Sequence, residues 1–126
     1  MKLLLDTSAL IWFLANDPSL SRLARDFIED QSATVIVSAV SAYEIDQKRT
    51  LGRKMPALPN DLMAALSAAS FDILPISFAH ASAAGRLPMS HKDPWDRLLI
   101  AQAQIEGVPI ASPDTVFAQF GCRVFW

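Results

Sequence analysis

Hydrophobic residues along this chain come in short runs that are separated by polar, helix-starting residues. The first run, leucines 3–5, has no polar alternation and ends on Asp6, Thr7 and Ser8. An unbroken apolar run of this length predicts a strand buried on both faces, as in a parallel sheet. Asp, Thr and Ser favour the start of a helix. The pattern therefore predicts a β-α unit that leaves Asp6 at the carboxyl end of a central strand.

The same alternation continues to the end of the chain. Apolar or β-branched runs predict four more strands, at 34–37, 72–75, 109–112 and 123–126. Helical spacing and capping residues predict helices at 9–14, 21–30, 38–52, 60–69 (capped by Asn60), 77–85, 93–107 and from about 114 to 120. Alternating strands and helices predict the α/β class, with a mostly parallel central sheet flanked by helices in a single domain spanning 1–126.

Composition adds a partner and a compartment to this picture. The 126 residues are 52% hydrophobic, which is high for a soluble monomer of this length and favours apolar surface covered by a partner. A single cysteine, Cys122, excludes an internal disulfide and fits a reducing compartment. No stretch is long enough to cross a membrane. We therefore expect a cytoplasmic protein that does not associate with membranes.

Four acidic residues are candidates for chemistry because of where the predicted elements place them. Asp6 and Asp114 each follow an apolar strand, and Glu44 and Asp96 lie near helix starts. Since ligands of open α/β sheets bind at the carboxyl ends of the strands, all four are expected at one edge. The formal net charge of −2 argues weakly against a nucleic-acid binder. Outside these four acids the chain has nine Asp and Glu against 11 Lys and Arg, a mildly basic remainder.

Each acid also has a purely structural interpretation. Asp6 and Asp114 could cap the helices that follow them. Glu44 stands at capping-box spacing from Ser41, although Ser38 is an equally good cap and would leave Glu44 in the second turn. Asp96 and Asp93 share one face at a helix start, where acids complement the helix dipole.

The combination is harder to explain structurally, because carboxylates this close repel each other unless a cation lies between them. All-oxygen ligands suit Mg²⁺ or Mn²⁺, which activate water and stabilise charge in phosphate chemistry. With one cysteine and two histidines, His80 and His91, a zinc site is disfavoured, and both histidines are expected to have surface or packing roles. Seven basic residues could hold a phosphate backbone around the pocket, although each one taken alone is better explained as solvated surface: Lys48, Arg49, Arg53, Lys54, Arg86, Lys92 and Arg97.

Several short motifs follow one another along the chain, at 3–10, at 37–45 with Lys48 and 51–53, at 91–103 (HKDPWDRLLIAQA), at 112–114 and at 124–126. Each motif alone is a weak signal, but their order and spacing together are specific. With these motifs, nearly the whole chain resembles PIN-domain proteins, and within them the VapC branch of ribonuclease toxins from bacterial toxin–antitoxin pairs.

This resemblance implies a Mg²⁺- or Mn²⁺-dependent endoribonuclease that cleaves RNA, with tRNA or rRNA as substrate. Asp6, Glu44, Asp96 and Asp114 would form the acidic quartet that holds the metal and orients the attacking water. Thr7 and Ser112 match hydroxyl residues beside the first and last acids, and Asp93 would be an accessory acid or the helix cap. The resemblance also implies a homodimer and a cognate VapB-type antitoxin.

Two positions depart from the family pattern, and two other functions remain open. Ser8 stands where relatives often carry His, and Tyr43 where they often carry Trp, which bears on substrate preference or packing. The same fold could be a catalytically silent module that binds RNA or an antitoxin. A receiver domain also groups acids at strand ends, but it needs paired acids after the first strand and a late Lys, and neither is evident.

Overall fold

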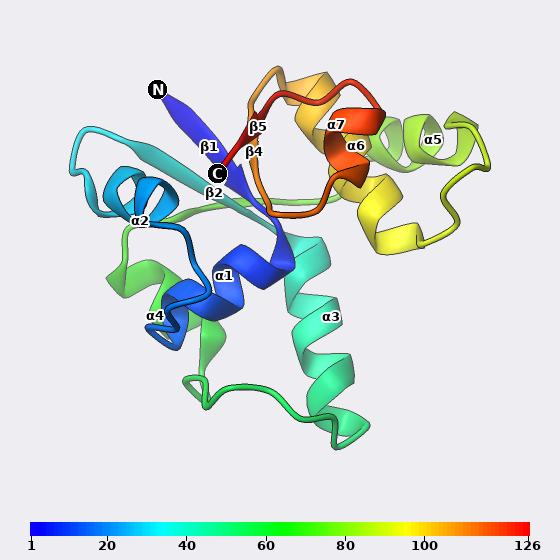
Figure 1. Cartoon of the computed structure of the whole chain (residues 1–126). Helices are drawn as coiled ribbons and strands as arrows, with labels where there is room; N and C mark the ends of the chain where they lie inside the picture. Colours follow the sequence, from blue (N-terminus) through cyan, green and yellow to red (C-terminus); the bar gives the residue numbers. More distant parts are fainter.

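The structure, a computed structural model, describes all residues 1–126. Its strands are β1 (Lys2–Leu5), β2 (Thr34–Ser38), β3 (Asp72–Leu74), β4 (Ile110–Ala111) and β5 (Val124–Phe125). They form one five-stranded sheet in the order β3-β2-β1-β4-β5, and every pair is parallel (Figure 1). The predicted fold class and all five predicted strands are confirmed.

The central strand β1 explains why the chain opens on three leucines. Leu3, Leu4 and Leu5 are all fully buried. Leu3 and Leu5 belong to the core on one face of the sheet, and Leu4 belongs to the core on the other. Because successive side chains of a strand point to opposite faces, a strand covered on both sides must be apolar at every position.

Helices cover the sheet on both faces. They are α1 (Thr7–Leu14), α2 (Arg22–Glu29), α3 (Ala39–Thr50), α4 (Leu62–Ala68), α5 (Phe78–Arg86), α6 (Pro94–Glu106) and α7 (Val116–Gln119). In Figure 1, α1, α2 and α4 lie on one side, α5, α6 and α7 on the other, and α3 projects from the end of β2. All seven predicted helices are present. None of them is long and apolar enough to span a membrane.

The helix starts settle two questions that the sequence left open. The Ser38 hydroxyl accepts from the Val40 amide and caps α3, so Glu44 lies in the second turn and is not part of a capping box. The prediction that Asn60 caps α4 was wrong: the Asp61 carboxylate accepts from the Ala64 amide, one residue later. Asp and Asn are equally good caps, so residue type alone could not choose between neighbours.

Parallel pairing brings the strand ends together. Leu5 is paired with Val37 on one side and with Ala111 on the other. The next residue of each strand, or the one after it, is polar or begins a helix. Residues separated by more than 100 positions in the chain therefore meet at one edge of the sheet.

Candidate active site

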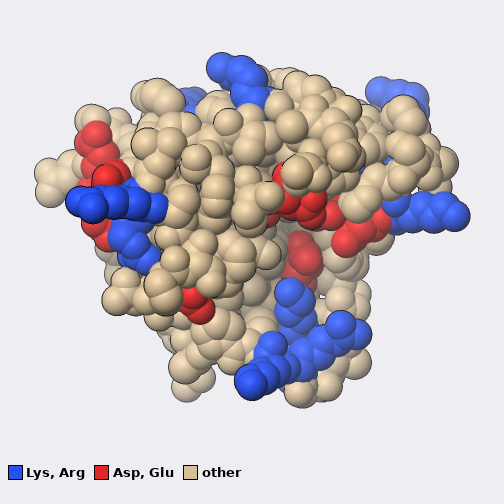
Figure 2. Space-filling model, viewed as in Figure 1, with Lys and Arg blue, Asp and Glu red and all other residues tan.

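The four predicted acids line one pocket at the carboxyl edge of the sheet. Its volume is about 240 Å³ and no hydrophobic residue lines it. Figure 2 shows acidic atoms gathered in a hollow of one face, with Lys and Arg atoms below them. The lining residues are Asp6, Thr7, Ser8, Glu44, Lys48, Asp96, Pro113 and Asp114. The structure thus brings together the four acids that come from four separate segments of the chain.

Asp6 is the most buried of the four, with only 6% of its surface exposed. Its Oδ1 accepts from the Ala9 amide at 2.7 Å and so caps α1. Burial raises the pKa of Asp6 to about 6, the nearby Ser112 hydroxyl and the Ala9 amide oppose the rise, and Asp96 and Glu44 add to it. Asp6 therefore has both the structural role and the position proposed for chemistry.

Glu44 faces the pocket from α3 and is held there by Thr7. The Thr7 hydroxyl donates to Glu44 Oε1 at 2.6 Å and lies 2.9 Å from the Ser41 hydroxyl. Burial raises the pKa of Glu44, the Thr7 hydroxyl and Lys48 lower it, and the nearby acids raise it further. Thr7, predicted beside the first acid, thus acts on the second one.

Asp96 enters from the first turn of α6. Its Oδ2 accepts from His91 Nε2 at 2.9 Å. Burial raises the pKa of Asp96, the His91 hydrogen bond lowers it, and Asp93 and Asp114 contribute repulsion. Asp93 itself caps α6 through the Trp95 amide and does not line the pocket, so the structure places it as the cap.

Asp114 lies beyond β4, next to Ser112. Its Oδ1 accepts from the Val116 amide at 3.0 Å, and the buried Ser112 hydroxyl accepts from the Asp114 amide at 2.9 Å. These bonds fix the turn that leads from β4 into α7. As a result the exposed Asp114 side chain stands at the rim of the same pocket.

The carboxylate oxygens of the pocket are the ligand type that a hard divalent cation prefers, but the side chains are too far apart to surround an ion directly. All four acids offer oxygen, and Glu44, Asp96 and Asp114 each have one carboxylate oxygen that accepts no hydrogen bond from the protein. No three Asp, Glu, His or Cys side chains lie close enough to grip an ion together. Mg²⁺ keeps several of its waters and is commonly held by one or two carboxylates, so a loose acidic pocket is compatible with a hydrated ion.

The contact between His91 and Asp96 was not predicted from the sequence, and the role predicted for Arg97 was wrong. His91, expected on the surface or in packing, hydrogen-bonds the carboxylate of Asp96. Its position five residues before Asp96, across a helix start, gives no periodic signal. Arg97, considered for phosphate contact, is buried and fully engaged by backbone carbonyls, so that prediction was wrong. The packing role expected for His80 is confirmed, since it is buried in the N-terminal turn of α5.

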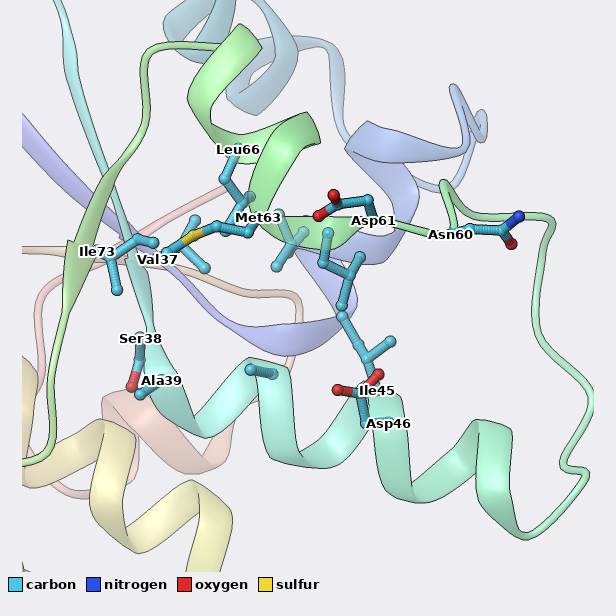
Figure 3. Close-up of a pocket in the computed structure, with 13 residues that line it drawn as sticks. Val37, Ser38, Ala39, Ile45, Asp46, Asn60, Asp61, Met63, Leu66 and Ile73 are labelled. Carbon is cyan, nitrogen blue, oxygen red and sulfur yellow. The ribbon is translucent and has the colours of Figure 1, made fainter.

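A second, apolar cavity lies on the other side of α3. Its volume is about 470 Å³, and Figure 3 shows residues from α3, α4 and the neighbouring strands turned toward it. Leu66, Met63 and Ile45 line its apolar part, while Asp46 and Asp61 also line it. This apolar groove was not predicted as such, although a partner-covered apolar surface was.

Comparison with known protein families decides the family. Residues 3–121 match the PIN domain. The chain belongs to the PIN-domain family. Proteins with this domain are generally nucleases, which makes hydrolysis of nucleic acid the activity to be considered for the acidic pocket. A comparison with curated proteins finds no match.

Several solved structures have the same fold. One is a chain of VapBC2 from Rickettsia felis, whose structure was solved bound to a DNA fragment of the VapBC2 promoter. It superposes on this chain with a TM-score of 0.75 at 16% sequence identity, and the match covers 99% of this chain and 98% of that one. A toxin–antitoxin complex from Klebsiella pneumoniae gives 0.67 at 19%, covering 98% and 96%. FitAcB from Neisseria gonorrhoeae gives 0.66 at 20%, also covering 98% and 96%. At these identities the likeness establishes the PIN fold.

Proposed function

We propose that this protein is a Mg²⁺- or Mn²⁺-dependent endoribonuclease and the toxin of a type II toxin–antitoxin pair. The observation that carries the proposal is the convergence of Asp6, Glu44, Asp96 and Asp114 on one polar pocket of a PIN domain. Burial and mutual repulsion raise the pKa of the first three of these. A pocket that penalises its own negative charge is suited to a cation.

The residues of the pocket have separable tasks in this proposal. The carboxylate oxygens that face the pocket would hold the metal, which supplies an activated water and stabilises charge on the phosphate. Thr7 fixes Glu44, and the Ala9 amide fixes Asp6, so neither acid depends on the metal for its orientation. Lys48 lines the same pocket and offers a positive charge to the phosphate of a bound RNA.

An antitoxin partner is the second part of the proposal. A chain of similar fold occurs in a toxin–antitoxin complex from Klebsiella pneumoniae. The apolar groove beside α3 offers a place for apolar side chains of a VapB-type antitoxin. The homodimer stays a prediction, which sedimentation of the purified protein tests directly.

RNA cleavage tests the catalytic part. Purified protein is incubated with tRNA and rRNA in Mg²⁺, in Mn²⁺ and in EDTA, and products are resolved on gels. We expect metal-dependent cleavage that Asp6→Asn and Asp96→Asn each reduce by more than about 100-fold, since both remove a charged oxygen from the pocket. Asp26→Asn, on the exposed face of α2, is the matched control. Cleavage that persists in EDTA, or that survives both pocket variants, contradicts the proposal.

One observation favours a different function, a module that binds RNA or an antitoxin without cleaving. No three carboxylates converge closely enough to enclose an ion directly. Tight RNA binding with no products under any metal, together with no measurable Mn²⁺ uptake, would support the silent module.

A further inference from the structure

The irregular segment between α5 and α6 is held by one buried arginine. Arg97, in the first turn of α6, is 6% exposed and has no carboxylate partner. Its guanidinium instead donates five hydrogen bonds to backbone carbonyls, of Ala84 (2.8 Å), Gly85 (3.4 Å), Leu87 (2.8 Å), Pro88 (2.7 Å) and His91 (3.0 Å). The last carbonyls of a helix lack partners within the helix, so Arg97 satisfies the end of α5 and folds the following segment against α6.

This arrangement fixes His91 from its backbone. Arg97 Nη1 holds the His91 carbonyl, and the His91 ring reaches back over the start of α6 to Asp96. An ionised carboxylate only accepts, so Nε2 is the donor in that 2.9 Å bond. The ring is 29% exposed and the Asp96 side chain 22% exposed, so the pair stands partly shielded at the pocket.

The bond constrains which oxygen Asp96 can offer. His91 engages Oδ2, and the structure gives Oδ1 no hydrogen bond from the protein. Without His91, rotation about the Cα–Cβ and Cβ–Cγ bonds would let the carboxylate swing between the pocket and solvent. Fixing one oxygen from behind leaves the other in place beforehand, which lowers the entropy lost when a ligand binds.

We propose that Arg97 and His91 act as positioning residues for the acidic pocket: Arg97 anchors the backbone of His91, and the His91 ring holds Asp96 in the orientation that receives a divalent cation. This inference rests on the proposed metal-dependent function and assigns a task to two residues outside the acidic quartet. In this proposal neither Arg97 nor His91 contacts the RNA or the reacting atoms.

The chain contains a matched control for the pair. His80 Nε2 lies 3.1 Å from Glu106 Oε2, a second histidine–carboxylate contact in which neither partner lines the acidic pocket. Glu106→Gln therefore perturbs a pair of the same chemistry away from the site. At position 91 itself, His91→Gln retains an N–H donor that can reach Asp96, whereas His91→Leu removes the donor and keeps the bulk.

The experiment measures Mn²⁺ affinity by titration calorimetry, together with kcat and KM for RNA over a range of Mn²⁺ concentrations. His91→Leu is expected to weaken Mn²⁺ binding by about 10-fold or more, with much of its kcat returning at high Mn²⁺ and little change in the KM for RNA. His91→Gln is expected to recover most of the affinity, and Glu106→Gln to leave it unchanged. Thermal melting of each variant separates these effects from loss of fold.

Arg97 is tested by a readout that does not need activity. Imidazole ¹⁵N NMR of the wild type is expected to show His91 with its proton on Nε2, and Asp96→Asn is expected to shift that resonance while leaving His80 unmoved. Arg97→Lys is expected to shift His91 in the same way, because one ammonium cannot span five carbonyls. A folded Arg97→Lys variant, checked by thermal melting, with an unmoved His91 resonance contradicts the anchoring role of Arg97.

Three outcomes separate this inference from the proposed function. If wild-type protein binds Mn²⁺ and cleaves RNA, yet His91→Leu matches it in both, the inference is wrong and the function stands. If His91→Gln and His91→Leu lose equal affinity, the ring acts through packing alone, and the inference is again wrong. If the wild type neither binds Mn²⁺ nor cleaves, the proposed function fails, and the inference about metal positioning falls with it, whatever the NMR shows.

Discussion

Two sides of helix α3 line two different cavities, one polar and acidic and the other mostly apolar. One side delivers Glu44 and Lys48 to a polar pocket of about 240 Å³, and the other delivers Ala42, Ile45 and Asp46 to the apolar groove of about 470 Å³. The first is lined by acids that repel one another, and the second by buried aliphatic side chains together with the exposed Met63 and Ile73. Because one side of α3 lines a polar pocket and the other lines an apolar groove, its hydrophobic residues do not form a single stripe facing one core.

The polar pocket and the apolar groove each lower the stability of the free protein, for different physical reasons. The polar pocket raises the pKa of Asp6, Glu44 and Asp96, which lowers the free energy of unfolding near neutral pH, and a bound cation would offset this loss. The apolar groove exposes hydrophobic area that a bound partner would return. Under the proposed function, a cation would stabilise the polar pocket and an apolar partner would cover the groove.

Two carboxylates on α3 test whether its two sides act independently, and they give the largest expected effect. Glu44 lines the polar pocket and Asp46 lines the groove, two residues apart on the same helix. We expect Glu44→Gln to lower RNA cleavage by more than about 100-fold, and Asp46→Asn to change it by less than about twofold. Initial rates on one RNA at fixed Mn²⁺ measure both. Equal losses from the two variants would show that the sides of α3 are not independent.

The second prediction concerns stability and pH. The pKa of Asp6 is about 6 in the folded protein and near its ordinary 3.8 when unfolded, because burial disfavours the charge. Between these values the folded state holds a proton that the unfolded state has lost, so the free energy of unfolding falls as pH rises from about 4 to about 6. A shift of this size corresponds to about 3 kcal/mol.

Urea denaturation in EDTA at pH 4 and pH 7 measures this loss. Asp6→Asn, which keeps a capping oxygen for α1, should remove most of the difference, while Asp26→Asn should keep it. The raised pKa values of Glu44 and Asp96 act with the same sign. If Asp6→Asn keeps the full pH dependence of the wild type, the raised pKa of Asp6 does not contribute to it.

The smallest effect is expected in the groove. Met63 lines it and is 64% exposed, so Met63→Lys should leave the fold intact and RNA cleavage within about twofold of the wild type. Binding of a co-expressed antitoxin should weaken, because a charged side chain would have to be desolvated against apolar groups. Unchanged antitoxin binding would place the partner elsewhere on the surface.

Sequence alone predicted the fold because strand and helix signals agree throughout. Leucines 3–5 indicated a doubly covered strand, and Asp93-Pro94 indicated the start of α6, both as the structure has them. The four acids were predicted to meet because parallel strands end at one edge, a rule of topology that needs no coordinates. They do line one pocket.

What the sequence could not supply are contacts between irregular segments and helix starts. His91 lies in a stretch without periodicity, and only the backbone path that Arg97 imposes turns its ring toward Asp96. Arg97 looked like any basic surface residue because burial of an arginine depends on how many carbonyls surround it in three dimensions. The apolar groove was hidden for a similar reason, since its walls come from α1, α3, α4 and two strands.

The order of the strands has a consequence for how this protein is made. Strand β1 lies at the centre of the sheet and pairs with β4, which comes more than 100 residues later in the chain. Such distant pairing forms late, because the intervening chain must be available before it can close. Asp96 and Asp114 reach Asp6 only when this closure occurs. Residues 1–95 alone supply only Asp6 and Glu44, so the four-acid pocket cannot form until β4 and Asp114 have been made.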